Sequence, residues 1–221
     1  MSQKNAISVA IDGPAGAGKS TVSKLLARET NFELLDTGAM YRAYAWLDLQ
    51  NNYGESLAPN ISNHVFEFDM SSGSMQVSCD DVDITTAIRS VEVTAHVSAV
   101  ASIAQVRTIA VEQQRAFIRH ELMEGKSVIL EGRDIGTTVL PNATLKFFLT
   151  ASPQERAKRR AAEVGGDVDE IAKSISQRDL IDSTRDVSPL VKAKDAILID
   201  ASDKSIEEVV QIMKNMIEDA Q

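Results

Sequence analysis

Short apolar runs alternate along this chain with longer stretches in which apolar residues recur every three or four positions. The first run, residues 7–11, alternates and is rich in β-branched residues, which is typical of a buried strand. Further runs, each expected to be a strand, lie at residues 32–35, 128–130, 145–149 and 197–199. The helical pattern occupies about residues 19–30, 39–49, 90–99, 103–124, 168–185 and 206–217. A further helix is expected to begin at Pro153. Strands separated by helices, several of them apolar on both faces, predict a parallel sheet covered by helices on both sides.

The pattern changes over residues 64–86. Apolar residues alternate on either side of the turn-forming segment 71–74, which predicts a small antiparallel hairpin, and residues 83–85 are expected to add a third short strand. We interpret this region as a compact β-rich insert at about residues 60–88. Two segments before the hairpin are rich in asparagine, glycine and proline and are expected to be loops: 51–54 and 59–60.

The segment after the first predicted strand reads Gly-Pro-Ala-Gly-Ala-Gly-Lys-Ser-Thr and fits the phosphate-binding pattern G-x-x-x-x-G-K-[ST]. Its position between a strand and a helix is the structural context that the motif requires. Glycines permit a left-handed backbone and let N–H groups face a phosphate, and the helix N-terminus adds partial positive charge. We expect Lys19 to reach the β- and γ-phosphates and Ser20 to ligate Mg²⁺. The residues expected to bind the triphosphate are Gly13, Ala15, Gly16, Ala17, Gly18, Lys19, Ser20 and Thr21.

Composition narrows the class of protein. The 221 residues suffice for one domain, residues 1–221, with a full core, and 43% hydrophobic and 25% charged residues are typical of a globular protein. The formal net charge of −9 argues against a general binder of nucleic acid or of anionic membranes. The single Cys79 excludes an intramolecular disulfide, and no apolar run approaches the length of a membrane span or a leader peptide. We therefore expect a cytoplasmic protein.

Arginines gather after the predicted strand ends, where parallel sheets bind ligands. Arg42 is expected one turn into the helix after Asp36. The others fall on shared helix faces or directly after a strand: Arg133 beside Asp134; Arg156, Arg159 and Arg160; Arg178 and Arg185 with Asp182. In an acidic chain, two phosphorylated substrates, a triphosphate and a monophosphate, would account for these clusters, because guanidinium matches phosphate geometry. The alternative is that these arginines are solvated and pair with neighbouring acids such as Glu155 and Glu163.

Several stretches together resemble the bacterial cytidylate kinases, which belong to the P-loop nucleoside monophosphate kinase family. They occur in order over nearly the whole chain: Ile11–Pro14 with the phosphate loop, Leu35–Arg42, Glu131–Thr137, Arg156–Arg160 and Arg178–Leu190. The resemblance implies a P-loop NTPase-type α/β fold and transfer of the γ-phosphoryl group of ATP, with Mg²⁺, to CMP or dCMP. It also implies a monomer, and an enlarged monophosphate-binding part at the β-rich insert.

The resemblance further implies how the acceptor nucleotide is bound. Arg178 and Asp182 would hold the ribose, Arg42 and Arg133 the phosphate, and Tyr41 would pack nearby. The base would be held by Thr37, Ser98, Arg107, Asp134 and Arg185. Cytosine presents an amino donor and two acceptors, which suit a carboxylate and arginines, whereas uracil would turn an oxygen toward Asp134. Thr37 stands where many members of the family have serine, and it keeps the hydroxyl.

The segment at about 153–170 resembles the mobile lid of these kinases. Its closure would exclude water and bring arginines onto the transferring phosphoryl group. We expect Lys19, Arg156, Arg159 and Arg160 to stabilise the transition state, with no obligatory general base. For Asp36 and Glu131 two readings stay open: they hold Mg²⁺ through water, or they cap and orient local loops.

Two other functions compete with this one. The first is a P-loop kinase for uridylate or for a non-nucleotide acceptor, against which Asp134 with Arg107 argues for cytosine. A P-loop switch that regulates a partner is disfavoured because the guanine-reading pattern Asn-Lys-x-Asp is absent and a switch needs no second phosphate site.

Overall fold

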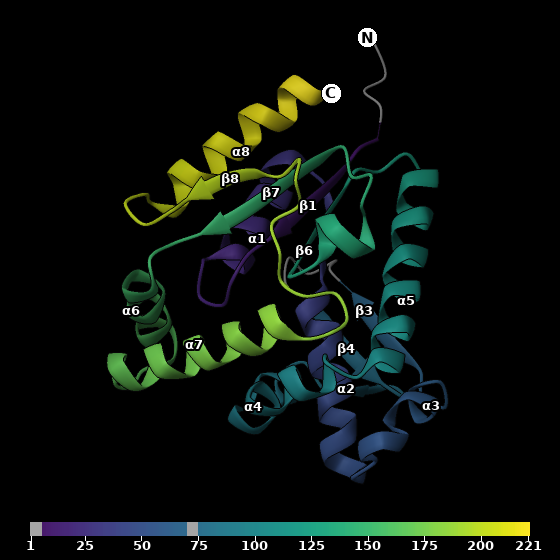
Figure 1. Ribbon diagram of the computed structural model, residues 1–221. Coiled ribbons are helices and arrows are strands. Elements are labelled where there is room, and N and C mark those ends of the chain that lie inside the picture. The colour runs from purple at the N-terminus through teal and green to yellow at the C-terminus, as the bar shows by residue number, and fades with distance from the viewer. Residues whose placement is uncertain (1–5, 70–74) are drawn as a thin grey trace. The chain divides into compact units, whose positions relative to one another are not determined.

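The computed structural model describes residues 6–69 and 75–221. Five strands form one sheet in the order β2-β6-β1-β7-β8 (Figure 1). The central strand β1 pairs in parallel with both neighbours, so that Val9 lies opposite Ile129 and Leu145. Every residue of β1 and β6 is buried, and because successive side chains point to opposite faces, both faces of the sheet are covered. The predicted fold class is confirmed. The strands are β1 (Ser8–Asp12), β2 (Glu33–Asp36), β6 (Val128–Gly132), β7 (Leu145–Thr150) and β8 (Ile197–Asp200).

The chain divides into two compact units. The first contains the chain up to Leu34 together with Ile118–Gln221, and the second contains Leu35–Phe117. We describe each unit by itself.

The first unit holds the parallel sheet and four of the helices. Helix α1 packs against β1, β6 and α8, and α6 and α7 pack against each other. Helix α8 begins with a capping box between Ser205 and Glu208 and buries Val209, Met213 and Ile217 along one face. The four helices are α1 (Lys19–Thr30), α6 (Pro153–Val164), α7 (Val168–Thr184) and α8 (Ile206–Ala220), close to the predicted bounds.

The second unit contains the β-rich insert. Strands β3 (Phe66–Asp69) and β4 (Gln76–Cys79) form the predicted antiparallel hairpin. The third strand is β5 (Val82–Asp83), slightly earlier than expected. The predicted turn at 71–74 lies outside the described residues. Around the hairpin are α2 (Thr37–Asn51), α3 (Leu57–Ile61), α4 (Val91–Val100) and the first part of α5 (Ala104–Met123).

One loop prediction in this unit was wrong. Residues 59–60 belong to the short helix α3 and not to a loop. Proline is tolerated in the first turn of a helix, where its missing N–H has no intrahelical partner. Leu57 and Ile61 of this helix are buried against Tyr44 and its neighbours in the core of the unit, so packing outweighed the loop signal.

None of the helices among the described residues is both long enough and apolar enough to cross a membrane.

Candidate active site

The phosphate loop has the geometry that its sequence predicts. Gly13, Gly16 and Gly18 have φ angles of 151°, 74° and 92°, which residues with a side chain rarely adopt. A Cβ atom on Gly13 would lie 2.0 Å from the carbonyl oxygen of Leu149 on β7, so only glycine lets the loop leave the sheet here. Helix α1 begins at Lys19 directly after Gly18, which places the N-terminal N–H groups of the helix beside the loop.

Lys19 lies in a cationic environment. Its side chain is buried and its Nζ donates to the carbonyl oxygen of Pro14 at 2.9 Å. Burial, followed by the charges of Arg133 and Arg178, lowers the pKa of Lys19 to about 7, although Glu131 and Asp12 act in the opposite direction. Anionic phosphate oxygens would offset both the burial and the repulsion. A bound anion would therefore favour the charged form of Lys19.

Asp12, the last residue of β1, is a site residue that our sequence analysis did not single out. Its carboxylate accepts the backbone N–H groups of Ile135 at 2.8 Å and Gly136 at 2.7 Å, which fixes the segment after β6. Burial raises its pKa to about 6 against the effect of these two hydrogen bonds. An acidic residue between a buried strand and the first loop glycine was the signal that could have identified it.

The two N–H groups that Asp12 accepts belong to an irregular element. Residues Ile135–Val139 form a π-helical turn that the sequence pattern did not predict. This turn begins directly after Asp134, so it is the element that sets where the Asp134 carboxylate lies. π-Helical turns are rare and occur frequently at functional sites.

Four of the predicted acceptor-site residues form one ion-pair network. Arg133 Nε donates to Asp182 Oδ2 at 2.9 Å, and Arg185 lies 3.7 Å from both Asp134 Oδ1 and Asp182 Oδ1. Arg185 Nε also donates to the carbonyl oxygen of Ser188 at 2.7 Å. Only 5% of the Arg185 side chain and 6% of the Asp134 side chain are exposed. The structure thus brings together the end of β6 and the last turn of α7.

The three arginines of α6 differ in their surroundings. Arg156 is buried, and its guanidinium donates to the carbonyl oxygens of Ala151 at 3.1 Å and Ala15 at 2.9 Å. Arg159 donates to the carbonyl oxygen of Ala201. Arg160 forms a 2.8 Å ion pair with Glu163, which is the pairing that the alternative reading anticipated.

Arg178, a further predicted substrate residue, lies on α7 in the first unit, and the others lie in the second unit. Asp36 caps α2 by accepting the Ala39 N–H and pairs with Arg42 at 2.9 Å. Burial alone would raise the pKa of Asp36, but Arg42 and the capping N–H together hold it below its usual value. The Arg107 guanidinium lies 5.3 Å from the centre of the Tyr41 ring, a cation–π distance. Thr37 and Ser98, the other predicted base ligands, are both buried.

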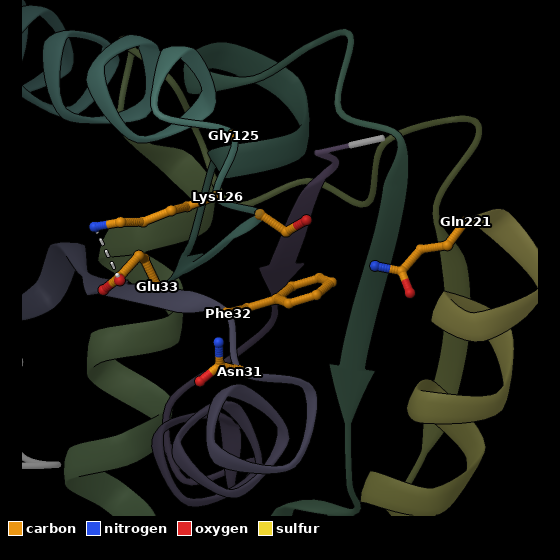
Figure 2. A pocket seen from close by; sticks show the side chains of 7 residues that line it. Asn31, Phe32, Glu33, Gly125, Lys126 and Gln221 are labelled. Atoms are coloured by element: carbon orange, nitrogen blue, oxygen red, sulfur yellow. Dashed lines mark ion pairs between the residues drawn. The ribbon is translucent and has the colours of Figure 1, made fainter. Parts of the chain in front are cut away.

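A separate cavity of about 300 Å³ lies where β2 and β6 begin, whereas the phosphate loop follows the end of β1 (Figure 2). Lys126 and Glu33 line it and form a 3.4 Å ion pair. The other lining residues are Asn31, Phe32, Gly125, Ser127 and Gln221. In parallel sheets ligands bind at the carboxyl ends of the strands, so this cavity is distinct from the phosphate site.

Comparisons with known proteins show the family to which the sequence is related. The sequence model of the cytidylate kinase family matches residues 9–219. The cytidylate kinase of Enterococcus faecalis is 44% identical over 220 residues, which cover 96% of this chain and 95% of that protein. The cytidylate kinase of Desulforamulus reducens is 46% identical over 218 residues, covering 95% and 96%.

Two solved structures share the fold at low sequence identity. An uncharacterized protein from Eubacterium ventriosum has a TM-score of 0.56 at 14% identity, covering 96% of this chain and 98% of its own. The protein TT1252 from Thermus thermophilus has a TM-score of 0.50 at 20% identity, covering 99% and 100%.

A parallel sheet whose first strand leads into a glycine-rich phosphate loop, with Arg133 directly after β6 and the buried Arg156 on the helix that follows β7, defines a P-loop kinase. The family model matches almost the full chain, and so do the two relatives, which narrows the class of P-loop kinases to one family. The chain belongs to the cytidylate kinase family.

Proposed function

We propose that this protein transfers the γ-phosphoryl group of ATP to CMP or dCMP, giving ADP and CDP or dCDP. The observation that carries the proposal is the buried network of Arg133, Asp134, Asp182 and Arg185 in a chain of this family. Two buried carboxylates between two arginines offer both acceptors and donors to one polar ligand. This combination suits a nucleoside monophosphate better than a purely anionic metabolite.

Asp134 would read the base. Its carboxylate accepts from the exocyclic amino group of cytosine, and Arg185 beside it donates to an acceptor on the same ring. Uracil carries an oxygen at that position, and a buried carboxylate facing an oxygen is strongly unfavourable. Thr37, Ser98 and Arg107 are proposed to contribute the other contacts to the base.

The sugar and the acceptor phosphate are proposed to bind to charged side chains. Arg178 and Asp182 would hold the ribose, and Arg42 and Arg133 the phosphate, with Tyr41 packed nearby. Both phosphate arginines pair with carboxylates, Asp36 and Asp182, so their guanidinium groups are already oriented. Oriented donors cost less to order when the phosphate binds.

The donor phosphates are proposed to bind at the loop from Gly13 to Thr21. Phosphoryl transfer depends on positioning and on neutralising charge, so Lys19, Arg156, Arg159 and Arg160 would act by stabilising the transferring group, without a general base. Helix α6 carries these three arginines, and the segment at about residues 153–170, which comprises α6 and the start of α7, is proposed to close as a lid over the nucleotide.

The donor set beside the loop fits Mg²⁺, which prefers oxygen ligands. The Ser20 hydroxyl lies in the first turn of α1, and buried Glu131 acts electrostatically on Lys19. When bound, Mg²⁺ neutralises phosphate charge. We propose Ser20 as a direct ligand and Glu131 as a holder of metal-bound water. Asp36 is the weaker candidate for such a role because Arg42 already engages its carboxylate.

An ADP-release assay with ATP·Mg²⁺ against CMP, dCMP, UMP, AMP and GMP at equal concentrations tests the function. Turnover confined to CMP and dCMP is the expected result. Turnover with UMP alone would overturn the proposed reading of Asp134, and turnover with none of them would reject the proposed reaction. We also propose that the enzyme is cytoplasmic and monomeric. Analytical ultracentrifugation tests its oligomeric state.

A further inference from the structure

Asp179 of α7 links the lid helices to the phosphate loop. Its Oδ1 accepts the backbone N–H of Ala15 at 3.0 Å, and its Oδ2 accepts from Nη1 of Arg156. The same Nη1 donates to the carbonyl oxygen of Ala15 at 2.9 Å. The N–H and the carbonyl of one loop residue are therefore both held by an ion pair between α6 and α7. The side chains of Arg156 and Asp179 are 9% and 20% exposed.

These contacts use groups that a bound phosphate would also use. The Ala15 N–H is one of the donors between Gly13 and Gly18, and a single N–H donates well to only one acceptor at a time. A carboxylate and a phosphate are both anionic acceptors, so they compete for this donor and repel each other. The same competition applies to the guanidinium of Arg156, a proposed stabiliser of the transferring group.

We propose that Asp179 is a positioning residue that stands in for a donor phosphate oxygen. It keeps Arg156 against the loop, and it exchanges the Ala15 N–H for a phosphate oxygen when the nucleotide binds. Asp179 thereby lowers the affinity for the donor nucleotide and raises the turnover number. The proposal rests on the donor phosphates binding at this loop, as in the proposed function.

Arg156 is well suited to such an exchange. Its Nε is held by the carbonyl oxygen of Ala151 at 3.1 Å, independently of Asp179, so the base of the guanidinium stays anchored when Nη1 changes partner. Gly16 lies next to the same residue, since a Cβ atom there would approach the Arg156 backbone oxygen to 3.0 Å. The loop and the start of α6 are therefore in direct contact at Ala15 and Gly16.

The test uses Asp179→Asn, which keeps the shape and one carbonyl acceptor but removes the charge, and Asp179→Ala as a second variant. Asp219→Asn is the matched control, because it removes the same charge from an exposed position of α8, outside the lid and the proposed site. The dissociation constant of ADP is measured by calorimetry in EDTA without acceptor, and the turnover number is measured with saturating ATP·Mg²⁺ and CMP. Thermal melting checks that each variant is folded.

We expect both Asp179 variants to bind ADP about 3–10 times more tightly than the parent, the effect of removing one charge-assisted competitor. We expect their turnover numbers to fall at least about tenfold, because Arg156 is no longer kept against the loop. Asp219→Asn should change neither quantity by more than about twofold. A merely structural role for Asp179 would weaken binding and turnover together.

Unchanged or weakened ADP binding in folded Asp179 variants would overturn the proposal, as would tighter binding with an unchanged turnover number. Failure of the proposed function is a different result. If the proposed function is wrong, the parent chain either does not bind ADP or binds ADP without phosphorylating CMP. If it binds ADP, comparing the ADP affinities of the variants still tests the competition.

Discussion

Asp134 and Arg185 face each other at 3.7 Å, with 6% and 5% of their side chains exposed. The first follows the end of β6 and is set by the π-helical turn that Asp12 holds. Arg185 directly follows the last residue of α7, and its Nε donates to the carbonyl oxygen of Ser188. Two elements distant in the sequence thus present an acceptor and a donor side by side, as the proposed recognition of cytosine requires.

Replacing Asp134 should therefore change the choice of base. In Asp134→Asn the side chain keeps an acceptor and gains an N–H donor that suits the O4 oxygen of uracil. We expect the ratio of kcat/KM for UMP to that for CMP to rise at least about tenfold, mainly through loss of CMP use. Steady-state kinetics with both nucleotides measure it, with Asp186→Asn, an exposed neighbour of the site, as control. An unchanged ratio would show that another group reads the base.

The depressed pKa of Lys19 predicts that nucleotide binding takes up a proton. With a pKa of about 7, the side chain is mostly neutral at pH 8, and bound phosphate favours its charged form. Uptake should approach one proton per ADP at pH 8, where the phosphates are fully ionised, and should become small near pH 6. Calorimetry in two buffers of different ionisation enthalpy measures the number of protons. Uptake should vanish in Lys19→Met and persist in Lys24→Met, and equal uptake in both would contradict the assignment.

Replacing Arg156 should lower both stability and turnover, whereas replacing Arg160 should lower turnover alone. Arg156 is buried with three partners, so Arg156→Ala should lower the free energy of unfolding by about 1–3 kcal/mol as well as the turnover number. Arg160 has one partly exposed partner, Glu163, so Arg160→Ala should change stability by less than about 0.5 kcal/mol while still lowering turnover. Urea unfolding and saturation kinetics give both numbers. Equal losses of stability would show that burial does not distinguish the two.

Gly13 should tolerate no side chain. In Gly13→Ala the new Cβ meets the carbonyl oxygen of Leu149 at 2.0 Å, so β7 or the loop has to move, and φ of 151° is strained as well. We expect a loss of about 3 kcal/mol or more in the free energy of unfolding. Gly54→Ala is the control, because its φ of 53° is also positive but its Cβ meets open space, and it should cost about 1 kcal/mol. Similar losses of unfolding free energy in the two variants would show that the positive φ angle, and not the clash with Leu149, causes the effect.

Local patterns determined most of the secondary structure. The alternation of strands and helices predicted the parallel sheet, and α1 has the bounds that its apolar spacing predicted. The phosphate loop could also be read directly, because its chemistry depends on contiguous residues with positive φ and on one helix N-terminus. Where local and tertiary preferences conflicted, as at Pro59, the buried contacts of Leu57 and Ile61 decided.

Pairings between distant residues were decided only by the tertiary structure. The sequence showed that Arg156, Arg159 and Arg160 share a helix face, but not that Arg156 is buried against Ala15 while Arg160 pairs with Glu163. It likewise gave no role to Asp12 or Asp179, because each acts on backbone N–H groups that only the folded chain brings within reach. A helical or strand period specifies which face a residue occupies, whereas the partner that it meets depends on how the elements pack.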